Sequence, residues 1–123
     1  MLDPTALQRI HGIGGPVLVG KMIDLLLTNA PQRLEKAMTA ARNKDWRAVE
    51  EAVHSLKSSA GNVGAVHLQE LAARIEVMVE NSQCAEAESL LNELAKVWEL
   101  VKVQLEVQRK GLESETDRCS GGQ

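Results

Sequence analysis

The sequence contains no phenylalanine and no tyrosine, and two tryptophans are its only large aromatic side chains. Stacking platforms for bases and sugars are built from aromatic faces, so functions of that kind are disfavoured. The apolar fraction is carried mainly by 16 Leu, 14 Ala and 12 Val. Because alanine and leucine lead the helix scale, whereas strands favour aromatic and β-branched residues, this composition predicts an all-α protein.

Long apolar runs and an excess of positive charge are also missing. Runs such as Leu25-Leu26-Leu27 are far shorter than a membrane span, and the N-terminus lacks the basic-then-apolar pattern of a signal peptide. We therefore expect a cytoplasmic protein that does not bind membranes. Seventeen acidic residues outnumber fourteen basic ones, and no basic block is present to follow phosphates, so nucleic acid is not an expected partner.

Cysteine is scarce as well. Cys84 and Cys119 lie 35 positions apart in the sequence, without the spacing of a metal site or the density of a disulfide framework. We expect two reduced thiols, no bound metal and no cofactor in this chain.

The length fits one domain, and apolar periodicity divides it into amphipathic stretches. Asp3-Pro4 is typical of a capped helix start, Gly12–Gly15 ends that short helix, and Pro16 opens the next. We expect a break or kink at Asn29-Ala30-Pro31 and a cap at Asp45. The predicted helical segments cover residues 4–11, 16–28, 31–42, 46–63, 65–81 and 85–110.

Short connections leave no room for crossovers, so the long stretches must be antiparallel neighbours. The predicted fold is an all-α, antiparallel up-and-down four-helix bundle covering residues 1–111. A short N-terminal helix lies across one end and covers the apolar edge with Leu7 and Ile10. Residues 112–123 are polar and without pattern after Gly111, which predicts a disordered tail.

One histidine does not fit a purely structural role. On a helical wheel, His54 lies opposite the apolar stripe of its segment, while Arg47, Lys57, Ser58 and Gly61 fall within about 60° of it. The wheel therefore predicts an exposed imidazole among a cation and small residues. The predicted buried stripe consists of Val49, Ala52, Val53, Leu56, Ala60 and Val63.

Two glycines follow His54 near the end of an otherwise strong helix. Each costs roughly 0.5–1 kcal/mol relative to alanine in a helix interior. Gly64 suits a helix end, but Gly61 lies on the exposed face, where alanine would be harmless. We interpret Gly61 as clearance that lets the backbone of another protein approach the imidazole.

These residues form a motif with a known parallel. The segment from His54 to Ala65 resembles the signature of the histidine-containing phosphotransfer (HPt) domain of phosphorelays. That signature has a histidine, an apolar residue two positions on, a lysine three on, small residues after it, and an aliphatic residue and a glycine at the helix end. The segment reads His54-Ser55-Leu56-Lys57-Ser58-Ser59-Ala60-Gly61-Asn62-Val63-Gly64-Ala65. The resemblance extends more loosely over residues 2–108, and Ser58 departs from the usual glycine.

The resemblance implies that His54 accepts a phosphoryl group from a receiver-domain aspartate and passes it to another. Neutral imidazole is a competent nucleophile near pH 7, and the Lys57 ammonium can stabilise the charge of the phosphoryl oxygens. Ser58 and Gly61 would support transfer by a hydroxyl donor and by clearance. The expected partners are response-regulator receivers and a hybrid sensor histidine kinase, with Mg²⁺ on the receiver, and the chain itself is an expected monomer without kinase activity.

Two rivals remain at the level of sequence. A single Glu51-x-x-His54 motif is found in di-iron bundles, but that chemistry needs two such motifs that project inward. The other rival is a helical adaptor that binds receivers or kinases without carrying phosphate. A free-standing protein and a domain of a hybrid kinase fit equally well. Whether Gln69 and Glu76, on the next segment, border the His54 surface depends on the handedness of the bundle, which the sequence leaves open.

Overall fold

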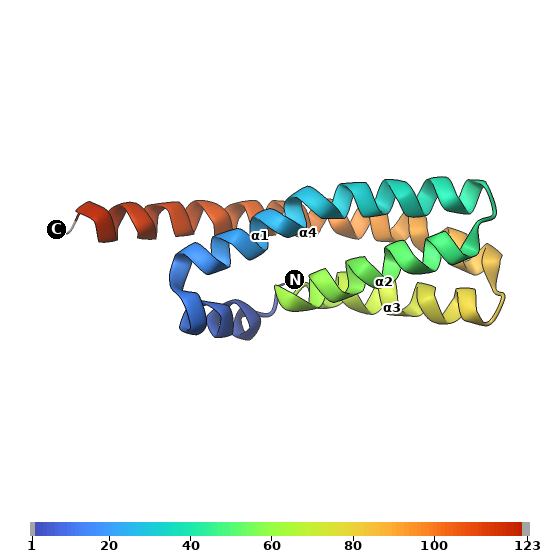
Figure 1. Cartoon of the computed structure of the whole chain (residues 1–123), viewed down its shortest axis with the longest axis horizontal. Helices are drawn as coiled ribbons and strands as arrows, with labels where there is room; N and C mark the ends of the chain where they lie inside the picture. The colour runs from blue at the N-terminus through green and yellow to red at the C-terminus, as the bar shows by residue number, and fades with distance from the viewer. Residues whose placement is uncertain (1, 122–123) are drawn as a thin grey trace.

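The protein is described by a computed structural model that covers the backbone of residues 2–121 and the side chains of residues 2–113. Four helices follow one another in this part of the chain: α1 (Pro4–Arg42), α2 (Trp46–Asn62), α3 (Val66–Glu80) and α4 (Cys84–Gly121). Helix α1 packs on α2 and α4, and α3 packs on the same two helices (Figure 1). The predicted antiparallel four-helix bundle is confirmed.

The core is aliphatic, as the composition requires. Each helix contributes a stripe of leucine, valine, isoleucine or alanine at helical spacing, and these stripes meet along the bundle axis. Trp98 is buried among them, while Trp46 is half-buried at the start of α2 and packs against the same cluster. The stripe predicted for α2 is buried at every position, namely Val49, Ala52, Val53, Leu56, Ala60 and Val63.

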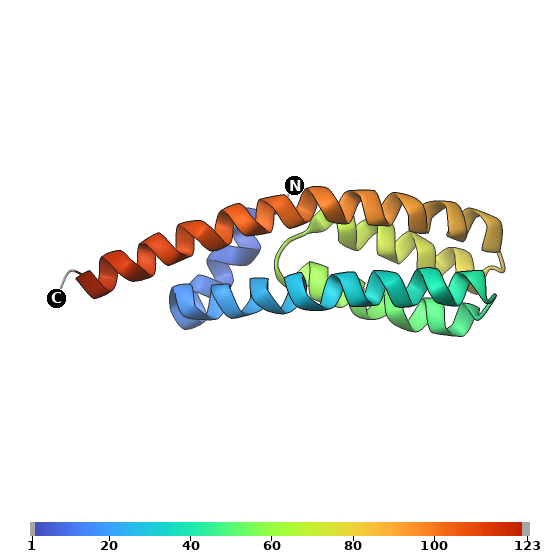
Figure 2. The same cartoon turned by 90° about the horizontal axis from the view of Figure 1, so that it is seen from above.

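The N-terminal segment folds back under one end of the bundle (Figures 1 and 2). Gly15 has φ 69° and ψ −168°, a conformation open to glycine, and this residue separates the short first segment from the long part of α1. The Asp3 side chain accepts a hydrogen bond from the Thr5 backbone, as expected of a cap. Leu7 and Ile10 pack against the core cluster, so the predicted end cover is confirmed.

Beyond Gly15, α1 runs without interruption to Arg42, with Pro31 inside it. The break that the sequence allowed at Asn29–Pro31 is therefore wrong, and the alternative of a kink there stays a prediction. Proline removes one backbone hydrogen bond, but Ala30 and Leu34 on either side are buried, and this packing keeps the helix continuous. By length and composition alone, α1 could also cross a membrane. Its face toward α2 and α4 is buried in the bundle, as at Ile23, Leu26 and Leu34, whereas Ile13, Val17 and Leu25 are exposed.

The last helix is longer than the sequence predicts. Its backbone stays helical past Gly111 to Gly121, so the predicted helix end at Gly111 is wrong. One glycine costs only about 1 kcal/mol in a helix, and Leu112 directly after it is buried against the core. Figure 2 shows the final turns of α4 projecting beyond the other helices. The boundary between a domain of residues 1–111 and a tail of residues 112–123 stays a prediction; residues 122–123 lie outside the described part.

Candidate functional site

Helix α2 is built to hold one side chain outward on a rigid support. Its first turn is capped by Asp45, whose carboxylate accepts a hydrogen bond from the Ala48 backbone at 3.3 Å. The buried aliphatic stripe fixes the rotation of the helix about its axis. His54 consequently lies on the opposite face, with 64% of its side chain exposed, as the wheel predicts.

The imidazole is held by a carboxylate from the neighbouring helix. Nδ1 of His54 lies 2.9 Å from Oε2 of Glu76 on α3. Because an ionised carboxylate only accepts, this bond places a proton on Nδ1. In the neutral ring Nε2 then keeps its lone pair, and it is the ring nitrogen that the Glu76 contact leaves uncovered.

The same carboxylate also binds Lys57. The Nζ atom of Lys57 lies 2.6 Å from Oε1 of Glu76, so the two carboxylate oxygens serve two different side chains of α2. Glu76 is 8% exposed, and burial by itself would raise its pKa. The hydrogen bonds from Lys57 and His54, together with their charges, outweigh that effect and hold the pKa of Glu76 below its usual value. Glu76 is therefore an ionised, nearly buried bridge between the two residues.

Gly61 lies two turns after His54, and the space above it is filled from within the chain. A Cβ atom added to Gly61 would lie 2.5 Å from Nε2 and 3.1 Å from Cδ of Gln69 on α3. The clearance predicted at this position is thus occupied here by the Gln69 side chain. Gly64, in contrast, has φ +75°, and a Cβ there would lie 2.6 Å from the backbone oxygen of Asp3. Gly64 is needed for the docking of the N-terminal segment.

The remaining predicted neighbours surround the imidazole less closely. Ser58 is exposed on the outer face of α2. Arg47 is 3.6 Å from Glu51, and both side chains are largely in solvent. An open hollow beside His54 is lined by Arg47, Glu50, Glu51, His54 and Glu76. Since Glu51 and His54 project outward, they do not have the inward arrangement that a di-iron site needs.

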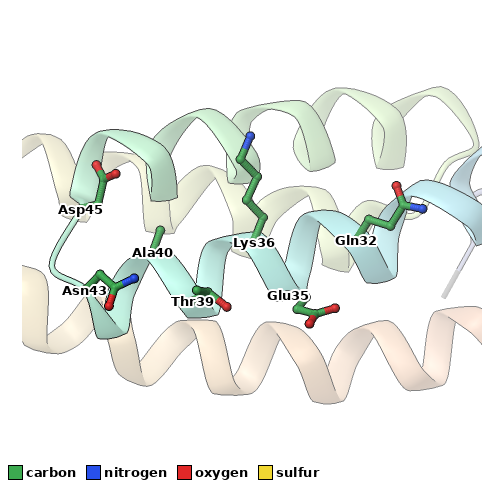
Figure 3. A pocket seen from close by; sticks show the side chains of 7 residues that line it. All are labelled: Gln32, Glu35, Lys36, Thr39, Ala40, Asn43 and Asp45. Atoms are coloured by element: carbon green, nitrogen blue, oxygen red, sulfur yellow. The ribbon is translucent and has the colours of Figure 1, made fainter.

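A second hollow contains none of these residues. It is shown in Figure 3 and lies along α1 near the connection to α2, and its polar side chains point in different directions. It is lined by Gln32, Glu35, Lys36, Thr39, Ala40, Asn43 and Asp45. Among the side chains that the structure describes, no group of three or more His, Cys, Asp or Glu residues is placed to hold a metal ion.

Fold and site together define a class: an antiparallel helical bundle that presents one histidine, fixed by an acid and accompanied by a lysine, to solvent. Residues 21–110 match the Hpt domain family, and the chain belongs to this family. No curated protein matches the chain. Its structure is similar to that of the histidine-containing phosphotransfer protein B (HptB) from Pseudomonas aeruginosa PAO1. The TM-score is 0.83 at 20% identity, over 89% of this chain and 94% of that one.

The chain is thus a histidine phosphotransfer protein of the phosphorelay type, a group that interacts with receiver domains and kinases. The sequence predicts His54 and Lys57 as site residues and leaves open whether Glu76 borders them. The available signal was an acid directly after Ile75, a core position of α3. A charged residue so close to the apolar stripe of a helix is rarely buried without a partner.

Proposed function

We propose that His54 is the residue that carries the phosphoryl group, taking it from a receiver-domain aspartate and giving it to another. The observation that carries this proposal is the shared Glu76 carboxylate, hydrogen-bonded to Nδ1 of His54 and ion-paired with Nζ of Lys57. Its two contacts leave Nε2 facing the solvent with its lone pair available. An exposed nucleophile on a rigid helix suits in-line attack on a phosphorus atom.

In the forward step, the lone pair of Nε2 attacks the phosphorus of the aspartyl phosphate. The bond from phosphorus to the aspartyl oxygen breaks, and its electron pair stays on the receiver carboxylate. The proton on Nδ1 does not move, so the phosphorylated ring of His54 becomes positively charged. Glu76 lies against this charge and stabilises it. In the reverse step the cationic ring is a good leaving group, so the same contact serves both directions.

Lys57 has two tasks in this scheme. One of its N–H groups faces Glu76, and the ammonium retains further donors for the non-bridging oxygens of the phosphoryl group. Its positive charge therefore opposes the charge that develops during transfer. Ser58, one turn after His54 and exposed, supplies a hydroxyl group on the side from which a partner arrives.

The chemistry that this chain lacks is assigned to its partners. Phosphoryl transfer from an aspartate uses a divalent cation, which we place as Mg²⁺ on the receiver domain, with no cofactor in this chain. The phosphate enters the relay from a hybrid sensor histidine kinase through its receiver. We further propose that the protein works as a cytoplasmic monomer without membrane or nucleic-acid partners, in keeping with its net charge of −3. Light scattering of the purified protein at rising concentrations tests the monomer.

The proposal is tested by incubating the protein with a phosphorylated receiver domain and following acid-labile, base-stable label. We expect label on the wild-type protein and none on His54→Gln. His67→Gln is the matched control, because His67 is also exposed, in the first turn of α3. The His67→Gln protein should accept label as the wild type does. Label that persists on His54→Gln overturns the assignment. Receiver binding without any label on the wild type would instead support the adaptor function.

A further inference from the structure

The contact between α2 and α3 contains a second polar side chain, Gln69, that the transfer chemistry does not use. Gln69 on α3 extends across α2 at Gly61, so that its amide occupies the place of a missing Cβ. Within the described residues, the structure gives this amide no hydrogen-bond partner. The side chain is half-buried, so its amide lies against the helix and also faces the surface.

Distance places Gln69 inside the area that a docked partner must cover. Seven residues separate His54 from Gly61, which is about 10 Å along a helix. A protein interface of standard size covers about 800 Å² on each partner, equivalent to a disc with a radius of about 16 Å. A receiver interface of this size centred on His54 therefore also covers the Gln69 amide. An amide that is covered without a partner costs free energy, so the covering surface must supply an acceptor.

We propose that Gln69, seated on Gly61, is a specificity-determining residue that donates a hydrogen bond to the docked receiver domain. This inference rests on the proposed function of His54. Gln69 acts on docking because its amide lies over Gly61, about 10 Å along α2 from His54, which is too far to touch the reacting phosphorus. Gly61 acts through Gln69, since only a residue without a Cβ lets the amide lie flat at this point.

The contact between the Gln69 amide and Gly61 predicts that substitutions at these two positions depend on each other in their effects on KM. In Gly61→Ala the new methyl group displaces the end of a flexible side chain, so the fold is retained while the amide loses its position. In Gln69→Ala the amide is absent and the space above Gly61 is open. A methyl group at position 61 then has nothing to displace. The effects of the two substitutions on KM should therefore not be additive.

The experiment measures transfer from a phosphorylated receiver domain to five proteins: wild type, Gln69→Ala, Gly61→Ala, the double variant and Gln69→Glu. The receiver is the one that exchanges phosphate fastest with the wild type. We expect Gln69→Ala to raise KM about 2- to 10-fold with kcat unchanged, which is the net effect of one hydrogen bond. Gly61→Ala should raise KM similarly, and the double variant should match Gln69→Ala. Gln69→Glu, which keeps the shape but loses the donors, should also raise KM.

Three results would overturn the inference: an unchanged KM for Gln69→Ala, a fall in kcat alone, or an equal effect of Gly61→Ala in both backgrounds. The last result would mean that Gly61 gives clearance to the partner itself. A wild-type protein that accepts no phosphate refutes the proposed function, and this inference with it. If the wild type accepts phosphate and the KM values of all five proteins agree, the inference alone is refuted.

Discussion

Two glycines of this bundle lie under long polar side chains, and the two places differ in what those side chains do. Gly20 on α1 lies under Arg109 of α4, whose guanidinium carbon would be 3.1 Å from an added Cβ. Arg109 donates two hydrogen bonds to Asp24, at 3.0 and 3.2 Å, so its charge is already paired. The Gln69 amide over Gly61 has no such partner in the described chain. In the first arrangement the donors are satisfied within the chain, and the second leaves donors for another molecule.

The acidic residues of the two regions differ in the same way. Asp24 is half in solvent, and its pair with Arg109 is screened by water and contributes little to stability. Glu76 is nearly buried, and two donors share it. Removing one partner from a buried charged group costs far more than removing one from a surface pair. This asymmetry shows where substitutions should change transfer and where they should not.

The largest expected difference in transfer rate between the Glu76 region and the Asp24 region is produced by Glu76→Ala. Without the carboxylate, Nδ1 of His54 loses the contact that keeps its proton and stabilises the charged ring. We expect transfer to slow about 10- to 100-fold, as for loss of a hydrogen bond to a charged group. Single-turnover transfer from a phosphorylated receiver measures it. Asp24→Ala is the matched control and should transfer at the wild-type rate; equal slowing in both variants would contradict the distinction.

A smaller effect is expected for Lys57→Ala. The variant keeps Glu76 on His54 but removes the positive charge beside the phosphoryl oxygens. We expect transfer to slow about 5- to 10-fold, with the helical circular dichroism of the wild type retained. Lys36→Ala, an exposed lysine on α1, is the control. An unchanged rate in Lys57→Ala would remove the electrostatic role proposed for this residue.

The smallest effect concerns stability in acid. Because the folded pKa of Glu76 lies below the reference value of 4.5, its ionised form stabilises the fold. That contribution is fully present above pH 4.5 and is lost as the pH falls through the folded pKa. The difference in unfolding free energy between the wild type and Glu76→Gln should therefore shrink below pH 4.5. Urea titrations from pH 3 to 7 measure it, and a difference independent of pH would contradict the paired, ionised state.

Much of the fold and half of the site follow from periodicity. The stripe through Val53 and Leu56 fixes the face of α2 that is buried, so the outward direction of His54 can be predicted without knowledge of any other helix. The position of Lys57 beside His54 can be predicted as well, because three residues are nearly one helical turn. The N-terminal cover follows from Leu7 and Ile10, which need an apolar surface.

The contacts of Glu76 and Gln69 could not be predicted in this way. They depend on whether α3 lies on the Lys57 side of α2 or on the other side, and both arrangements bury the same stripes. The predicted break before Pro31 and the predicted helix end at Gly111 were wrong for a different reason. Pro31 and Gly111 are local breakers, but the packing of Ala30, Leu34 and Leu112 outweighs their local preferences. Contacts between helices therefore determine both the neighbours of His54 on α3 and the continuity of α1 and α4, which the local sequence does not.

The central claim is that Glu76 fixes the proton of His54 on Nδ1 and so makes Nε2 the nucleophile. Long-range ¹H–¹⁵N spectra of the imidazole near pH 8, before and after phosphorylation by a receiver domain, test it most directly. We predict the Nδ1–H tautomer in the free protein and phosphorus attached to Nε2 in the phosphorylated one. A ring protonated on Nε2, or phosphorus attached to Nδ1, would contradict the account.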